Sequence, residues 1–239
     1  MEKLMKRLYR GLVPEFVRRT IKDRETYREY ENLRKTPKHT YYRFDETKSI
    51  FIHIPKAGGI SIIKSLYGEE ANGFGHPTYE RFLRMYGKRR YESYFKFTFV
   101  RNPWDRLLSA YNFLKNGGMN HLDKQFSDDV LKNYDSFESF VMEGMNEANI
   151  ETWTHFIPQY RYIYDAQMNL VVDYVGRFEH FEFDFEHIRS VLQQGSSLQH
   201  RNKTGESKEE NYRAAYTPEM IQKVAELYQN DIRMFGYEF

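Results

Sequence analysis

Apolar positions along the chain follow two periods, one typical of buried strands and one typical of helices. Residues 50–54 are almost continuously apolar, as in a parallel strand that is buried on both faces. Residues 94–100 and 171–178 are rich in aromatic and β-branched side chains and also predict strands. Helical spacing follows each strand, over residues 60–66, 103–114 and about 179–192. Strands that alternate with helices predict an α/β fold with a central, mostly parallel sheet flanked by helices.

Further helices are predicted at residues 78–86, at 137–145 and in one continuous run from 217 to about 234. Residues 115–135 are predicted to be irregular, because an Asn-Gly-Gly sequence at 116–118 breaks the preceding helix. Asn102 is a good N-cap, Pro103 suits the first helical position, and Asp105 stands where the acid of a capping box would lie.

The end of the first strand has the pattern of a phosphate-binding turn. Residues 49–61 read Ser-Ile-Phe-Ile-His-Ile-Pro-Lys-Ala-Gly-Gly-Ile-Ser, a strand followed by a glycine-rich turn and a helix N-terminus. The free amides of a first helical turn and its positive dipole end suit an anion. Gly58 and Gly59 let the backbone approach that anion, and Lys56 adds a full positive charge. We therefore predict a P-loop-like three-layer fold that binds a phosphate-bearing ligand.

A Walker-type nucleotide loop does not fit this turn, because that motif places Lys and then Ser or Thr after its last glycine. Here Lys56 precedes both glycines, and the second strand ends in Val100 and Arg101 instead of a metal-binding acid. A kinase on a P-loop-like fold is thus the weaker alternative. A second anion contact is predicted at Arg101 and Ser109, which stand eight residues apart, roughly two helical turns. Arg101 has a structural ion pair as its alternative, and Arg106 is expected to pair locally.

Composition limits the partners that the chain can have. Its 36 Lys and Arg against 34 Asp and Glu argue against nucleic-acid binding by charge alone. The chain has no cysteine, and its eight histidines show no metal-binding spacing, so we expect no metal. The sequence shows neither an apolar span nor a secretory signal, so we expect a cytoplasmic protein. Residues 1–45 are predicted to form a helical arm, with weak membrane-surface contact as its alternative. Oligomeric state stays open.

Two segments resemble the signatures of the carbohydrate sulfotransferase superfamily. They are Pro-Lys-Ala-Gly-Gly-Ile-Ser at 55–61 and Phe-Thr-Phe-Val-Arg-Asn-Pro-Trp-Asp-Arg-Leu-Leu-Ser-Ala-Tyr at 97–111. The resemblance extends through residues 174–179, 200–204 and 228–237, and implies one sulfotransferase domain over residues 46–239. Such enzymes use 3′-phosphoadenosine 5′-phosphosulfate as the sulfate donor. The chain looks like a bacterial-type member without a membrane span.

The resemblance also implies roles for individual residues. The 5′-phosphosulfate would lie on Lys56 and the turn formed by Ala57, Gly58, Gly59, Ile60 and Ser61. The 3′-phosphate would lie on Arg101 and Ser109, beneath a cationic loop with Arg201, Asn202 and Lys203. His76, in a Gly-His-Pro-Thr-Tyr segment, resembles the part of 2-O-sulfotransferases that supplies the histidine base. His155 is the alternative base or an acceptor contact, and Trp153 lies in the segment expected to bind the acceptor.

The expected reaction is metal-independent transfer of a sulfuryl group to a hydroxyl of a carbohydrate or glycoconjugate. Lys56 would stabilise charge on the leaving phosphate, and His76 would take the proton of the acceptor hydroxyl. The alternatives are the kinase named above and a glycan- or nucleotide-binding module without catalytic activity.

Overall fold

The computed structural model describes residues 27–73, 75–195 and 212–239. Three parallel strands form the sheet in the order β1-β2-β3: β1 is Ser49–Ile52, β2 is Phe95–Val100 and β3 is Tyr174–Arg177. Ile52 pairs with Thr98, and Val100 pairs with Arg177, so the carboxyl ends of the strands meet at one edge. The predicted α/β class and parallel sheet are thereby confirmed.

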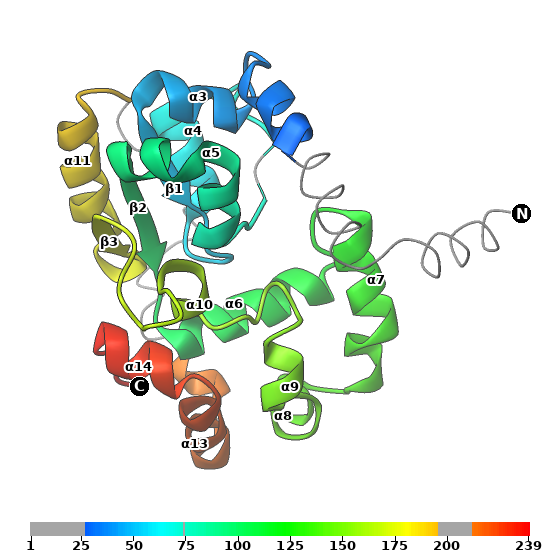
Figure 1. Cartoon of the computed structure of the whole chain (residues 1–239). Helices are drawn as coiled ribbons and strands as arrows, with labels where there is room; N and C mark the ends of the chain where they lie inside the picture. Colours follow the sequence, from blue (N-terminus) through cyan, green and yellow to red (C-terminus); the bar gives the residue numbers. More distant parts are fainter. Residues whose placement is uncertain (1–26, 74, 196–211) are drawn as a thin grey trace, which may run out of the picture.

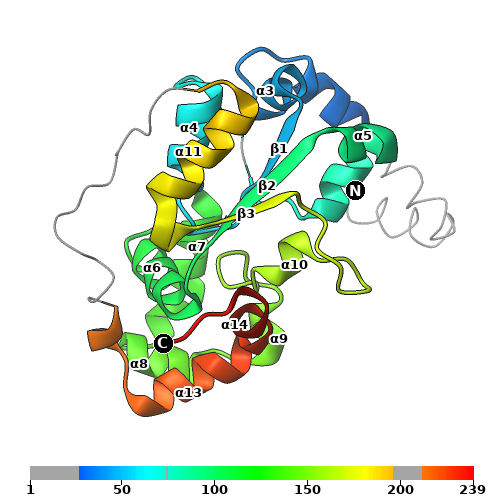
Figure 2. The same cartoon turned by 90° about the vertical axis from the view of Figure 1, so that its left-hand side faces the viewer.

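Helices cover both faces of this sheet and make three layers. α4 (Gly59–Tyr67) and α11 (Phe181–Leu192) lie on one face, and α5 (Tyr79–Ser93) lies on the other (Figures 1 and 2). α3 (Thr40–Thr47) packs beside β1 and α4, and residues 27–34 are also helical. Residues 1–26, most of the predicted arm, lie outside the described residues.

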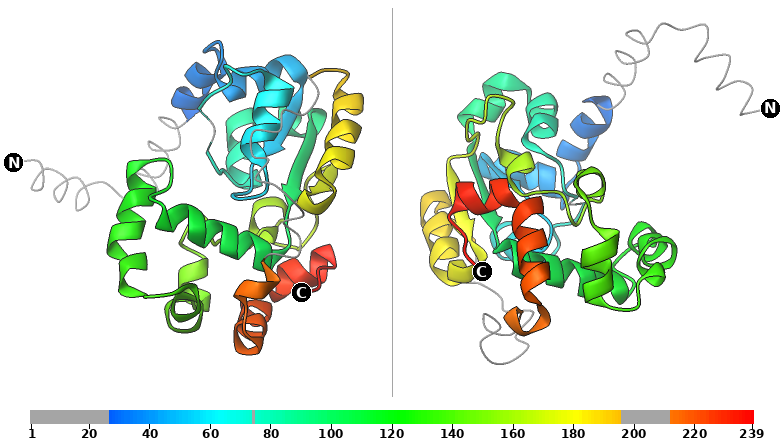
Figure 3. Two further views of the ribbon diagram at one scale, coloured as in Figure 1. Left: turned by 180° about the vertical axis from the view of Figure 1, so that it is seen from behind. Right: turned by 90° about the horizontal axis from the view of Figure 1, so that it is seen from below.

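Beyond the carboxyl ends of the strands lies a second group of helices (Figure 3). It contains α6 (Pro103–Lys115), α7 (His121–Asp129), α8 (Phe137–Ser139), α9 (Glu147–Ile150), α10 (Tyr160–Ile163), α13 (Pro218–Leu227) and α14 (Gln229–Phe235). Short helical turns η1 (Leu131–Asn133) and η2 (Phe140–Gly144, a π-helix) lie between α7 and α9, and η4 (Arg213–Ala215) precedes α13. The turn η3 (Phe178–His180) joins β3 to α11.

Two apolar clusters divide the core at this edge of the sheet. One surrounds the strands and includes Phe51, Phe97 and Ile62, and the other lies among α6, η2 and α13 and includes Trp104 and Phe140. The strand ends lie between the two clusters. In open α/β sheets this edge is where ligands bind, because it carries the loops between strands and helices.

Two expectations for local structure are corrected. Residues 121–129 form α7 inside the stretch expected to be irregular, because Asn120 caps the helix by accepting the N–H groups of Leu122 and Asp123. The final helix is two helices, α13 and α14, which meet at Tyr228.

Within the described ranges, no helix has both the length and the apolar character needed to cross a bilayer.

Candidate active site

The turn after β1 adopts the conformation expected of a phosphate-binding turn. Lys56 and Gly58 both have positive φ, at 68° and 81°, which brings the chain sharply from β1 into α4. Gly58 is the N-cap of α4 and offers no side-chain cap, so the first-turn amides keep their capacity to bind an acceptor. The predicted strand, turn and helix are thus present, and the amides of residues 57–61 lie at the positive end of the α4 dipole.

Packing also explains why two glycines stand here. A Cβ on Gly58 would lie 2.6 Å from Cε2 of Phe181, and a Cβ on Gly59 would lie 1.9 Å from Cδ2 of His53. Because real Cβ atoms do not approach other atoms so closely, any larger residue would push α11 or the His53 ring away from the turn.

Lys56 lies in partly apolar surroundings. Its Nζ is 4.0 Å from the centre of the Phe113 ring, which is a cation–π contact. Burial lowers the pKa of Lys56 to about 8, and the nearby charge of Arg101 acts in the same direction. The amine is therefore mostly protonated at neutral pH, and its partly desolvated charge lies against the Phe113 ring.

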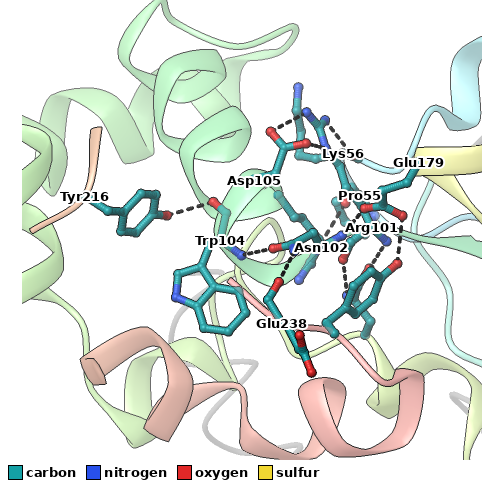
Figure 4. A network of polar contacts seen from close by, with 12 residues as sticks. Pro55, Lys56, Arg101, Asn102, Trp104, Asp105, Glu179, Tyr216 and Glu238 are labelled. Atoms are coloured by element: carbon teal, nitrogen blue, oxygen red, sulfur yellow. Dashed lines mark hydrogen bonds and ion pairs between the residues drawn. The ribbon is translucent and has the colours of Figure 1, made fainter. Parts of the chain in front are cut away.

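Arg101 is both a structural residue and a candidate phosphate ligand. Its Nε and Nη2 donate to the Asp105 carboxylate at 2.7 Å, and its Nη1 donates to the Lys56 carbonyl at 3.0 Å (Figure 4). These contacts use three of the five guanidinium N–H groups, which leaves two for a ligand. The Phe178 ring supports the guanidinium at 4.1 Å. Arg101 therefore connects the second strand end to the turn, whereas Ser109 lies half-buried further along α6.

Asp105 does not act as the acid of a capping box, because its carboxylate is taken by Arg101. Asn102 does cap α6, by accepting the Trp104 N–H at 3.1 Å. The backbone N–H of Asn102 donates instead to Glu179 at 2.5 Å (Figure 4). Glu179 also accepts the Tyr237 hydroxyl at 3.0 Å, so the carboxyl-terminal segment contributes to the position of the second signature.

A buried glutamine holds the backbone of Arg101. The Gln159 side chain accepts the Arg101 N–H and donates to the Arg101 carbonyl, both at 2.8 Å. The backbone N–H groups of Gln159 and Tyr160 donate in turn to the buried Asp231 carboxylate, at 2.7 and 2.9 Å. The sequence reasoning missed Gln159 and Asp231, because neither has a local pattern that reveals a partner so far away in the chain.

Three histidines gather beside Lys56 and Phe113. The His76 ring centre lies 4.4 Å from that of His53 and 5.8 Å from that of His155, and His155 lies 5.1 Å from Phe113. The structure thus brings both predicted base candidates to the turn. In the described part of the chain, no group of three or more His, Asp or Glu is arranged to hold a metal.

The two candidate bases are oriented differently. His76 Nδ1 lies 3.0 Å from the His53 carbonyl, and as donor to it leaves Nε2 with a free lone pair. Burial lowers the pKa of His76 to about 4, so its ring is neutral at physiological pH. His155 Nε2 lies 3.0 Å from the Asp123 carboxylate, and burial also lowers the pKa of His155. Sequence reasoning missed Asp123, which lies on the helix that it did not predict.

His155 and Trp153, the predicted acceptor residues, line one pocket of about 170 Å³. Arg201, Asn202 and Lys203 lie outside the described residues. Arg106 is buried and structural: its Nε donates to the Pro55 carbonyl at 3.0 Å, and its Nη2 donates to the Ile157 carbonyl at 2.8 Å.

Replacing Arg106 should therefore destabilise the fold. We expect Arg106→Met to lower the free energy of unfolding by about 3–5 kcal/mol, because buried carbonyls and the buried Asp231 lose their cation. The melting temperature should fall by about 10 °C, measured by thermal unfolding. The control is Arg161→Met, which removes an exposed ion pair with Glu151 and should change stability by less than about 0.5 kcal/mol. Equal effects of both substitutions would contradict this role.

The fold and the turn define an α/β protein of P-loop-like architecture, and comparison with known proteins gives its family. The Sulfotransferase family profile matches residues 39–238, so the chain belongs to the sulfotransferase family. Carbohydrate sulfotransferase 12 of Mus musculus is 26% identical over 195 residues, which cover 68% of this chain and 46% of the mouse protein. Carbohydrate sulfotransferase 12 of Xenopus laevis is 24% identical over 199 residues, which cover 70% of this chain and 47% of the frog protein.

The chain thus spans about half the length of these two curated relatives. An uncharacterized protein of Archaeoglobus fulgidus is 26% identical over 129 residues, which cover 53% of this chain and 89% of the archaeal protein. No solved structure matches the chain significantly.

Proposed function

We propose that the chain transfers a sulfuryl group from 3′-phosphoadenosine 5′-phosphosulfate to a hydroxyl of a carbohydrate. The observation that carries the proposal is the junction of two cationic positions at neighbouring strand ends, where Arg101 Nη1 donates to the carbonyl of Lys56 at 3.0 Å. Membership of the sulfotransferase family and the likeness to two carbohydrate sulfotransferases support the reaction and the acceptor class.

The two positions suit the two ends of such a donor. The 5′-phosphosulfate would lie against Lys56 and the amides of residues 57–61, at the N-terminus of α4. The 3′-phosphate would take the two remaining N–H groups of Arg101 and the hydroxyl of Ser109. Arg201, Asn202 and Lys203 remain candidates for a cationic cover on the basis of the sequence alone.

The chemistry would be an in-line displacement. A bond forms between the acceptor oxygen and sulfur while the bond from sulfur to the 5′-phosphate oxygen breaks. Lys56 stabilises the charge that grows on that phosphate oxygen, and the α4 amides assist it. The proton of the acceptor hydroxyl passes to His76 Nε2, which the contact with the His53 carbonyl leaves free. His155 is the second candidate base, favoured by its Asp123 partner, since a carboxylate on the other ring nitrogen orients a base.

Nucleotide binding followed by thermal unfolding tests this proposal against a kinase. The product 3′-phosphoadenosine 5′-phosphate, without magnesium and at about 100 times its Kd, should stabilise the protein by about 2.7 kcal/mol. That corresponds to a rise in melting temperature of about 5–10 °C. ATP with magnesium should stabilise it far less. Greater stabilisation by ATP than by 3′-phosphoadenosine 5′-phosphate would contradict the proposal. Nucleotide binding without sulfate transfer to any glycan would indicate a binding module.

A further inference from the structure

The pocket beside His155 has a composition that bears on the acceptor. Its volume is about 170 Å³, below the roughly 300–1,000 Å³ of sites for drug-sized ligands, so it suits a single ring. It lies between the end of α6, one side of α7 and the segment 152–156. Its lining residues are Leu114, Leu122, Asp123, Phe126, Thr152, Trp153, Thr154, His155 and Phe156.

This pocket adjoins the turn that would hold the donor. Lys56 Nζ lies 4.0 Å from the centre of the Phe113 ring, and the Phe113 ring centre lies 5.1 Å from that of His155. His155 itself lines the pocket, and its ring also neighbours His76. A hydroxyl group bound there would lie beside both candidate bases and close to the amine of Lys56.

The charge that faces the pocket is negative. Burial alone would raise the pKa of Asp123, but hydrogen bonds from the Met119 N–H and from His155 lower it, so the carboxylate is ionised. Burial lowers the pKa of His155, although the hydrogen bond and the charge of Asp123 act in the opposite direction. Among the described residues that line the pocket there is no lysine or arginine.

The remaining lining is apolar, aromatic or hydroxylic. Phe126 and Trp153 meet edge to face at 4.9 Å between ring centres, and Phe156 closes the same wall. Such a wall suits the C–H face of a sugar ring, while the Thr152 and Thr154 hydroxyls can exchange hydrogen bonds with its hydroxyl groups. A carboxylate or sulfate on that ring would face Asp123, and no described lysine or arginine lines the pocket to balance it.

We infer that the sugar unit that receives the sulfuryl group is uncharged, and that a uronate or an already sulfated unit is rejected at this position. The inference rests on the proposed sulfotransferase function and names the acceptor class for it. Asp123 is the residue that determines this specificity, through repulsion between like charges.

Matched pairs of acceptors test the inference. Methyl β-glucoside and methyl β-glucuronide differ only in a CH₂OH group or a carboxylate, and the corresponding galactose pair differs in the same way. With radiolabelled donor, kcat/KM for the neutral member should exceed that for the uronide by about tenfold or more. Equal rates, a preference for the uronide, or no transfer to either neutral sugar would overturn the inference.

Substitution of Asp123 assigns the preference to its charge. In Asp123→Asn the ratio between neutral and anionic acceptor should fall to about threefold or less. The ratio is informative even if kcat drops, because a loss of His155 orientation affects both acceptors alike. The control is Asp128→Asn on the same helix, where Asp128 pairs with Lys124 at the surface and the ratio should not change. A ratio that persists in Asp123→Asn contradicts the inference.

Nucleotide binding distinguishes a failure of the acceptor inference from a failure of the proposed sulfotransferase function. If 3′-phosphoadenosine 5′-phosphate stabilises both the parent protein and Asp123→Asn, the fold and the donor site are intact. A reversed acceptor preference then rejects only the acceptor class. If the nucleotide fails to stabilise the parent protein, the proposed function itself is rejected.

Discussion

Lys56→Ala is expected to lower kcat by about 10²–10³-fold while the Kd of 3′-phosphoadenosine 5′-phosphate changes little. The reason is that the amine acts on charge that appears on the leaving phosphate oxygen only as the sulfuryl group departs, and loss of one such donor costs about 2.7–4 kcal/mol of barrier. The α4 amides and Arg101 remain to bind the ground state. Steady-state kinetics and isothermal titration of the nucleotide measure the two effects separately.

The pH dependence provides a control for this assignment. Because the pKa of Lys56 is about 8 in the free protein, its charge is present below that pH and is lost as the pH rises through it. The value of kcat/KM for the donor should therefore decline above about pH 8, and Lys56→Arg should shift the decline upward. Equal losses in kcat and nucleotide affinity in Lys56→Ala would show that Lys56 contributes only to binding.

His76→Ala should lower kcat by about 10²–10⁴-fold without changing the nucleotide Kd. The expected loss is that of a general base, since Nε2 of His76 is left as the free acceptor by the contact between Nδ1 and the His53 carbonyl. With a pKa of about 4, the ring of His76 is already unprotonated throughout the neutral range, so it requires no prior deprotonation. Single-turnover rates with saturating donor isolate this step.

His155→Ala is the matched control for His76→Ala, since both rings lie in the same cluster. We expect His155→Ala to raise KM for the acceptor more than it lowers kcat, because His155 lines the pocket that would bind it. If His76→Ala retains turnover and His155→Ala loses it, the base is His155 with Asp123 as its orienting partner.

Local patterns predicted those parts of the fold that local physics determines. The three strands are short apolar runs, and the helices that follow them carry regular apolar stripes, so period and composition were enough to locate them. The α7 helix was not predicted, because its nine residues include only Leu122 and Phe126 as large apolar side chains. Its position is held by tertiary contacts, among them the pair of Asp123 with His155.

In the candidate site too, the sequence predicted the residues with local signals and missed those that only the folded chain brings in. The turn with Lys56 and the second strand end with Arg101 carry signals within a few residues, and the structure brings them together through one hydrogen bond. The residues from distant segments that contact Arg101 carry no such local signal. Gln159, for example, is 58 residues away and reaches the Arg101 backbone only in the folded chain. The glycines were predicted for ligand approach, which stays a prediction, and the structure adds that His53 and Phe181 leave no room for a Cβ there.

The central claim is that one adenosine nucleotide, phosphorylated at both its 3′ and 5′ positions, joins the two strand ends. The most direct measurement is a crystal structure of the full chain soaked with 3′-phosphoadenosine 5′-phosphate. We predict the 5′-phosphate against Lys56 and the first-turn amides of α4, and the 3′-phosphate against Arg101 and Ser109. A nucleotide bound elsewhere, or crystals that take up none at millimolar concentration, would contradict the account.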